Sequence, residues 1–174
     1  MTDESPLKIA IAHYQQGDVD IALEKLQALL ITEPQNPEVR IEFANILMRE
    51  KRFDDAREVL NSLSVEDKQD PTALVLIGQL DSIETVINAP ELDELLVEIE
   101  RNPKNYLARE QLSAHYKLRG DYISAMEQLL EIVRSDRNYN EDAGRTELLK
   151  IFNTLGHKHE LIGHYRRKLA QLLN

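Results

Sequence analysis

AIAHYQQGDVDIALEKLQALLITEP (residues 10–34) is followed 34 residues later by ANILMREKRFDDAREVLNSLSVEDK (residues 44–68), which repeats its pattern. The residues in register are Ala10, Gly17, Ala22, Leu26 and Pro34 in the first copy, and Ala44, Lys51, Ala56, Leu60 and Lys68 in the second. The residues between them keep the apolar spacing of amphipathic helices. Because a unit of two short helices cannot bury its apolar faces alone, such units must stack. The sequence therefore predicts an all-α stack of helix hairpins.

Helix starts and turns repeat with the same period. Asn36-Pro37 and Asp70-Pro71 each place an N-cap side chain before a proline at the first helical position. Gly17-Asp18 and Gly120-Asp121 predict turns with a left-handed glycine, followed by an aspartate that caps the next helix. We expect about five hairpins, with helices near residues 5–16, 19–32, 37–50, 53–63, 71–84, 90–101, 105–119, 122–135, 141–155 and 158–172.

The third unit is degenerate. It keeps Gly78, where small residues such as Ala10 and Ala44 let two helices approach, but it has residues 85–88 and Pro90 where an alanine is due. Its second helix must therefore begin late. The pattern recovers around Ser113 and Ala125, which lies 103 residues after Ala22, three periods plus one inserted residue. We expect a single repeat domain over residues 1–174, with better-formed halves 1–88 and 89–174.

Composition limits the classes of function. The 174 residues are 42% hydrophobic and 30% charged, which is typical of a folded domain. The chain has no cysteine, which excludes disulfides, thiolate metal sites and cysteine nucleophiles. A formal charge of −10 argues against a nucleic-acid partner, because phosphate contacts need a surplus of lysine and arginine. No apolar run is long enough to span a membrane, and an acidic start at residues 1–5 is unlike a secretory signal, so a cytoplasmic location is expected.

Catalytic, cofactor and metal sites are not expected. His157, His159 and His164 with Glu160 resemble a metal cluster in composition, but His159 and His164 are five residues apart and do not share a helix face. The chain has no glycine-rich phosphate loop and no nucleophile elbow. We therefore predict a protein that is not an enzyme.

The repeat pattern resembles the tetratricopeptide repeat, which implies a right-handed solenoid of helix hairpins that binds proteins. A closer resemblance is to the repeat domain of the YbbN-type thioredoxin-like proteins, the chaperedoxins. The residues that carry it are Asn102-Pro103, Ala108-Arg109, Gly120-Asp121-Tyr122, residues 125–130, Arg134, Asp136, Leu155-Gly156 and Tyr165-Arg166-Arg167.

This second resemblance implies a bacterial holdase that protects unfolded or oxidised clients and passes them to a chaperonin of the GroEL type. In that family a thioredoxin-fold domain precedes the repeats, and these residues contain no counterpart of it. The chain is therefore expected to be the C-terminal part of a longer protein. The alternative is a structural or oligomerisation scaffold that packs against the thioredoxin-fold domain.

The tetratricopeptide resemblance implies that the first helix of each hairpin lines an inner wall. This wall would be mostly aliphatic and suited to an apolar peptide or an amphipathic helix. The candidate residues are Leu7, Ile11, Tyr14, Ile41, Asn45, Met48, Val75, Gln79 and Ile83. Helical spacing alone does not separate a groove from a packed core, so both interpretations remain open for these side chains.

The last expected helix has two apolar faces. Leu161, Tyr165, Leu169 and Leu172 form one stripe, which is expected to pack on the preceding hairpins. The residues expected partly outside this stripe, as candidates for contact with a partner, are Ile162, Arg166, Arg167, Lys168 and Leu173. Residues 145–174 carry six basic and two acidic side chains, which suits an acidic partner. The alternative is a helix that only caps the open end of the stack.

Overall fold

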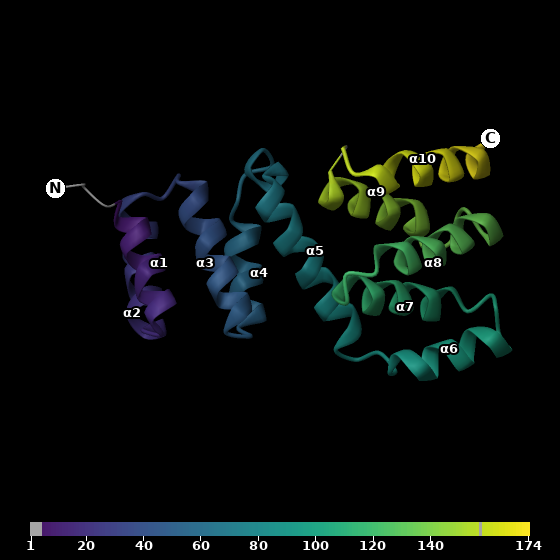
Figure 1. Ribbon diagram of the computed structural model, residues 1–174, viewed down its shortest axis with the longest axis horizontal. Coiled ribbons are helices and arrows are strands. Elements are labelled where there is room, and N and C mark those ends of the chain that lie inside the picture. Colours follow the sequence, from purple (N-terminus) through teal and green to yellow (C-terminus); the bar gives the residue numbers. More distant parts are fainter. Residues whose placement is uncertain (1–4, 157) are drawn as a thin grey trace. The chain divides into compact units, whose positions relative to one another are not determined.

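The computed structural model describes residues 5–156 and 158–174, and all the regular secondary structure of these residues is helical (Figure 1). Its elements are α1 (Pro6–Gln16), α2 (Val19–Thr32), α3 (Pro37–Arg49), α4 (Phe53–Asn61), the 3₁₀ turn η1 (Asp67–Gln69), α5 (Pro71–Val86), α6 (Leu92–Arg101), α7 (Tyr106–Leu118), α8 (Tyr122–Ser135), α9 (Ala143–Leu155) and α10 (Glu160–Leu173). Each α-helix begins and ends within two residues of the expected position. The 3₁₀ turn was not expected.

The chain divides into two compact units, and the division lies inside α5. The first unit ends at Ile77, and the second is Gly78–Asn174. The boundary therefore falls earlier than residue 88, where the sequence places the end of the first half. We describe each unit by itself.

The first unit contains two helix hairpins. α1 packs along α2, α3 packs along α4, and α2 also packs against α3. At the points of closest approach, Ala10, Ala22, Ala44 and Ala56 are each 0% exposed. A larger side chain at any of these positions would push the paired helices apart, because a close-packed interior has no space to accept it. The repeated alanines therefore determine how closely the hairpins close.

The predicted helix caps are confirmed at three of four positions. The side chains of Asn36, Asp70 and Asp121 accept hydrogen bonds from the backbone N–H groups of Glu38, Thr72 and Ser124, at 3.0, 2.8 and 3.0 Å. Asp18 does not cap α2 with its side chain. Its Oδ2 instead lies 3.3 Å from Nδ1 of His13, so the prediction for Asp18 is wrong.

The turn inside each hairpin needs a left-handed residue. Gly17 and Gly120 supply it with φ of 91° and 75°, as predicted, but the equivalent residue of the second hairpin is Lys51, with φ of 58°. A side chain at positive φ brings its Cβ close to the following carbonyl oxygen. The second hairpin therefore folds with a strained turn.

Replacing Lys51 with glycine is expected to raise the free energy of unfolding by about 0.5–1 kcal/mol, because the strain relieved exceeds the extra entropy of an unfolded glycine. Chemical denaturation of the variant and the parent protein measures the change. Arg119→Gly is the matched control, because Arg119 lies one residue before the corresponding turn with φ of −89°. The free energy of unfolding of the Arg119→Gly control should fall. If it also falls in Lys51→Gly, the turn at Lys51 is not strained.

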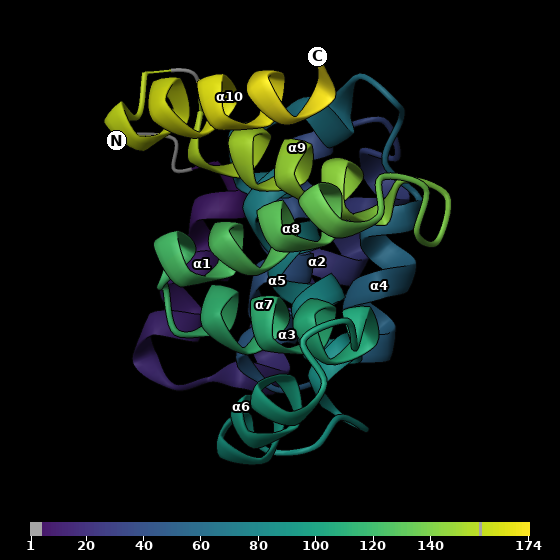
Figure 2. The same cartoon turned by 90° about the vertical axis from the view of Figure 1, so that its right-hand side faces the viewer.

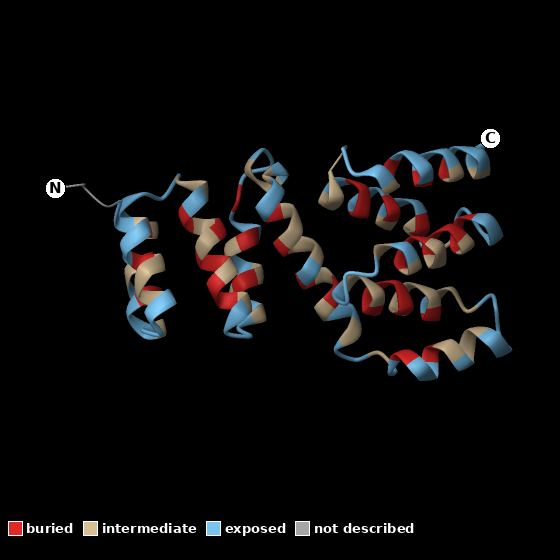
Figure 3. Ribbon diagram, in the orientation of Figure 1, coloured by how far each residue is buried: buried red, intermediate tan, exposed pale blue. Residues whose placement is uncertain are grey.

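The second unit is a stack of helices. α6 packs on α7, α7 on α8 and α8 on α9, while α10 contacts both α8 and α9. Figures 1 and 2 show α6 to α10 following one another in this order. The buried residues lie on the facing sides of these helices, and α8 supplies six of them (Figure 3). α6 packs along α7, the first helix of the next hairpin, which agrees with the degenerate third unit.

Glycine at position 144 lets α9 lie close to α8. A Cβ at Gly144 would lie 3.0 Å from Cγ2 of Val133, 3.1 Å from the carbonyl oxygen of Leu129 and 3.2 Å from Cβ of Ile132. Two of these neighbours are backbone or Cβ atoms that cannot rotate away. A residue larger than glycine at position 144 would therefore force α8 and α9 apart.

Candidate protein-binding groove

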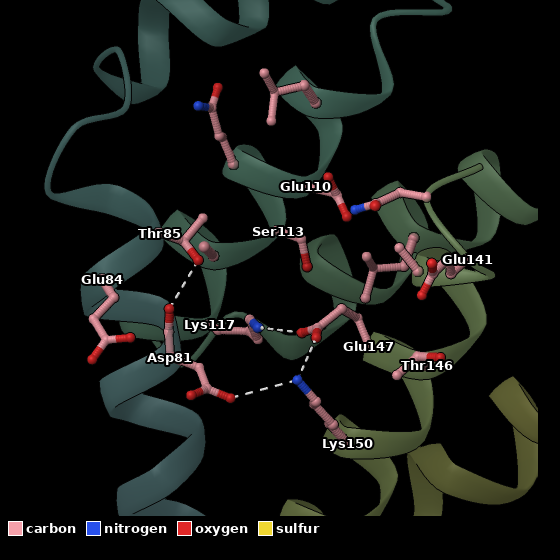
Figure 4. A pocket seen from close by; sticks show the side chains of 16 residues that line it. Asp81, Glu84, Thr85, Glu110, Ser113, Lys117, Glu141, Thr146, Glu147 and Lys150 are labelled. Atoms are coloured by element: carbon pink, nitrogen blue, oxygen red, sulfur yellow. Dashed lines mark hydrogen bonds and ion pairs between the residues drawn. The ribbon is translucent and has the colours of Figure 1, made fainter. Parts of the chain in front are cut away.

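A groove of about 730 Å³ opens on the second unit, and the first helices of successive hairpins form its walls. The C-terminal part of α5, one face of α7, and α9 with the loop before it contribute nearly all the lining side chains (Figure 4). The charged lining residues are Asp81, Glu84, Glu110, Lys117, Glu141, Glu147 and Lys150. Five carboxylates face two ammonium groups, so the groove has a surplus of three negative charges.

Both ammonium groups are already engaged in the groove (Figure 4). Glu147 of α9 accepts from Nζ of Lys117 at 3.1 Å and pairs with Nζ of Lys150 at 2.7 Å. Lys150 also lies 3.5 Å from Oδ2 of Asp81 on α5. Burial opposes ionisation of Glu147, but the two lysines outweigh it and hold its pKa below the ordinary value. The lysines thus tie α5, α7 and α9 together through their carboxylate partners.

Glu110 on α7 is not in a comparable ion pair, although the charge of Lys117 also acts on it. Its Oε2 accepts a hydrogen bond from the Tyr139 hydroxyl at 3.0 Å, and no lysine or arginine in the described ranges forms an ion pair with it. Burial raises the pKa of Glu110, and the charge of Glu147 adds to this. The hydrogen bonds from Tyr139 and Asn140 and the charge of Lys117 oppose the rise and only partly offset it. Burial and Glu110 together raise the pKa of Tyr139 to about 12. Glu110 is therefore a carboxylate that the folded protein ionises at a cost.

Glu110→Gln is expected to raise the free energy of unfolding at pH 7. Because the folded pKa of Glu110 lies above its unfolded value of about 4.5, the ionised group destabilises the fold at neutral pH. This penalty declines as the pH falls through the raised pKa, and it is absent below the unfolded value. Urea denaturation at pH 7 and at about pH 4 should show a gain in stability only at the higher pH.

Glu94→Gln is the control for this comparison, since Glu94 is exposed on α6. It should change stability little at either pH. If Glu110→Gln instead destabilises the protein at pH 7, contacts within the fold stabilise the ionised carboxylate by more than burial destabilises it. That result would contradict the argument from burial.

Ser113 is a second buried polar group in the groove wall, and its hydroxyl makes no hydrogen bond. Its side chain is 2% exposed, and its hydroxyl has no hydrogen-bond partner among the described residues. Figure 4 shows this hydroxyl directed toward the space beside Glu147 and Lys117. A buried hydroxyl without a partner costs about 1–3 kcal/mol. Ser113 occupies the small-residue position of its hairpin, where the first unit has alanine.

The inner-wall candidates of the first unit are mostly half-buried. Leu7, Ile11, Asn45, Met48 and Val75 are partly exposed, whereas Ile41 is only 8% exposed. Ile41 therefore belongs to the core and leaves the set of side chains open to a partner.

The Tyr14 hydroxyl donates to Oε1 of Glu50 at 2.9 Å. Burial, followed by this bond, raises the pKa of Tyr14. The wall of the first unit is thus less uniformly aliphatic than expected.

The α5 candidates Gln79 and Ile83 do not line the groove of the second unit. Asp81, Glu84 and Thr85 do so instead. The 34-residue spacing that relates the first and second hairpins therefore does not identify the groove residues of α5, the long first helix of the degenerate unit. The wall that results is polar where the sequence analysis expected aliphatic side chains.

Sequence reasoning missed the groove residues of α7, although a signal for them exists. Shifting Leu7, Ile11 and Tyr14 by the same 103 residues that relate Ala22 to Ala125 gives Glu110, Ala114 and Lys117. All three line the groove. The repeat register therefore finds this wall once it is carried past the inserted residue.

The candidates on α10 are divided between core and surface. Ile162 is 1% exposed and packs in the core cluster with residues of α8 and α9, so it is not available to a partner. Lys168 pairs with Glu127 of α8 at 2.6 Å and lies over the Tyr165 ring. Arg166 lies over the ring of Phe152.

Of the five candidates, Arg166, Arg167 and Leu173 are exposed. Capping of the stack by α10 thus accounts for most of this set.

Ile162→Ala is expected to lower the free energy of unfolding by about 3 kcal/mol, since it empties space in a packed core. Leu173→Ala, at a residue that is 37% exposed, should cost much less and is the control. Thermal unfolding followed by circular dichroism measures both. Equal, small losses would mean that α10 is not part of the core of the second unit.

No group of three or more histidine, cysteine, aspartate or glutamate side chains within residues 5–156 and 158–174 is placed to hold a metal ion. His157, which belongs to the histidine cluster considered above, lies outside these residues. None of the helices in the described residues is both long and apolar enough to cross a bilayer.

Stacked hairpins, alanines at the helix crossings and a groove walled by first helices define a helical-repeat protein. Two family models, both described as tetratricopeptide repeat, match residues 87–174 and 13–80. The chain belongs to the tetratricopeptide-repeat family. Repeats of this family are in general non-catalytic modules that bind other proteins.

Three known proteins resemble the chain. An uncharacterised protein of Haemophilus influenzae is 24% identical over 94% of this chain and 75% of its own length. A domain of a protein of unknown function from Vibrio parahaemolyticus is 27% identical, with 99% of this chain and 100% of that chain covered and a TM-score of 0.44. A thermophilic TPR protein of Thermus thermophilus is 19% identical, with 97% of each chain covered and a TM-score of 0.45.

Proposed function

We propose that this chain is the non-enzymatic, protein-binding part of a thioredoxin-like holdase chaperone. In this function it binds segments of unfolded or oxidised client proteins, a chaperonin of the GroEL type, or both. The observation that carries the proposal is the open groove walled by α5, α7 and α9, in a chain of the tetratricopeptide-repeat family. The chaperone context is supported by the sequence resemblance of residues 102–167 to the repeat domain of the chaperedoxins.

The half-buried wall of the first unit offers apolar contact of the kind that unfolded clients need. Leu7, Ile11 and Met48 are partly exposed there, and methionine adapts its shape to varied partners. Aliphatic side chains in the first unit and charged ones in the second would let one chain hold segments of different composition.

Client holding is tested by light scattering of a chemically denatured protein, citrate synthase, diluted into buffer with the chain. The intact chain should suppress aggregation, and Leu7→Gln with Met48→Gln should suppress it several-fold less, because apolar contact is lost. Ile31→Gln with Val65→Gln is the matched control, since these side chains are 81% and 84% exposed. Circular dichroism confirms that each variant keeps its helices.

Chaperonin binding is tested separately, with purified GroEL-type chaperonin and sedimentation. Arg167→Glu, on the exposed part of α10, should weaken the complex, whereas Lys104→Glu, exposed before α7, should not. No suppression of aggregation, no chaperonin complex and a mass that rises with protein concentration would contradict the proposal. That combination would favour the oligomerisation scaffold.

A further inference from the structure

We infer that the groove walled by α5, α7 and α9 binds a peptide segment of a partner protein that carries lysine or arginine side chains. The inference rests on the protein-binding function proposed above and adds the chemistry of the bound segment. Three observations carry it: the charge of the lining, the unpaired hydroxyl of Ser113 and the buried, only partly compensated carboxylate of Glu110.

The charge of the groove selects a cationic ligand. Of the seven charged lining residues five are acidic, and Lys117 and Lys150 are held by Glu147 and Asp81. A concave surface with one prevailing sign of charge concentrates ligands of the opposite sign. A basic segment can therefore enter without displacing the two lysines, whereas an acidic segment would meet a surplus of carboxylates.

Ser113 independently indicates that the groove accepts a polar ligand. Its hydroxyl has no partner in the described part of the chain, although the side chain is almost fully buried in the groove wall. An unpaired buried hydroxyl is costly, and alanine would fill the same small position without that cost. A backbone carbonyl or amide of a bound segment would satisfy it once the neighbouring groove side chains move aside, because the hydroxyl itself is closed to solvent in the free protein.

Glu110 provides the point where a basic side chain is held. Its Oε2 accepts a hydrogen bond from the Tyr139 hydroxyl, Asn140 supplies a further hydrogen bond, and burial still disfavours the ionised form. A guanidinium group would donate two parallel hydrogen bonds to such a carboxylate, and in a partly desolvated site this pairing is strong. The free protein thus bears a cost that a bound arginine offsets.

The test is fluorescence anisotropy with two labelled peptides, one of five Ala-Arg repeats and one of five Ala-Glu repeats. The full chain should bind the arginine peptide and not the glutamate peptide, with affinity that falls as salt is raised. Glu84→Gln with Glu110→Gln should weaken binding by about tenfold or more, since hydrogen bonds to charged groups are lost.

Glu94→Gln with Glu100→Gln is the matched control, because both residues are exposed on α6 and the net charge changes equally. An equal loss of affinity in the two double variants means attraction to the acidic chain as a whole, and this would overturn the inference.

Ser113→Ala separates a binding role from a packing role. Removal of an unpaired hydroxyl should leave the free protein at least as stable, while binding of the arginine peptide weakens by about fivefold. Unchanged affinity would show that Ser113 meets no ligand and would overturn its part of the inference.

The chaperone proposal and this inference fail in different ways. If the chain holds clients but does not bind the arginine peptide, the inference of a basic ligand is wrong and the chaperone proposal stands. If the peptide binds at the groove but neither clients nor chaperonin do, the inference stands and the chaperone context falls.

Discussion

Close approach of paired helices over alanine is the constraint on which the rest of the structure depends. The first unit has Ala10, Ala22, Ala44 and Ala56 at its crossings, and the second has Ala125, all without exposed surface. Only when the helices of a hairpin meet at this distance do their remaining faces match those of the next hairpin. The inner positions of the first helices are then left to line a surface rather than to fill a core.

Local chemistry explains why the helices could be predicted so well. Prolines at first helical positions, capping side chains and left-handed glycines act over three or four residues, so their effect is readable from the sequence. Asp18 shows the limit of this reasoning, since its carboxylate lies against His13, five residues earlier, and makes no cap hydrogen bond. The groove was harder to predict because it depends on the inserted residue of the third unit and on how α5 is turned there. Similarly, Ile41 and Ile162 have the spacing of surface positions, and only tertiary packing shows that they are buried.

Two groups that line the groove of the second unit destabilise the folded protein. Glu110 is ionised at a cost, and Ser113 is buried without a hydrogen-bond partner. In the same groove Lys117, Lys150, Glu147 and Asp81 compensate one another across three helices. This contrast separates the charges that hold the walls together from the groups that remain available to a ligand. Burial of polar groups without compensation is typical of functional sites, where folding stability is given up for binding.

Gly144 has a consequence for evolution of the groove. The residue lies on the side of α9 that packs against α8, whereas Glu147 and Lys150 lie on the side that faces the groove. Because a methyl group at position 144 would meet backbone and Cβ atoms at about 3 Å, any larger residue displaces α9 and the groove residues it carries. A substitution at position 144, which no ligand touches, can therefore change the width of the groove. The size of the peptide segment that fits in the groove would change with it. Related chains that differ at this position would differ in ligand size while their groove side chains stay the same.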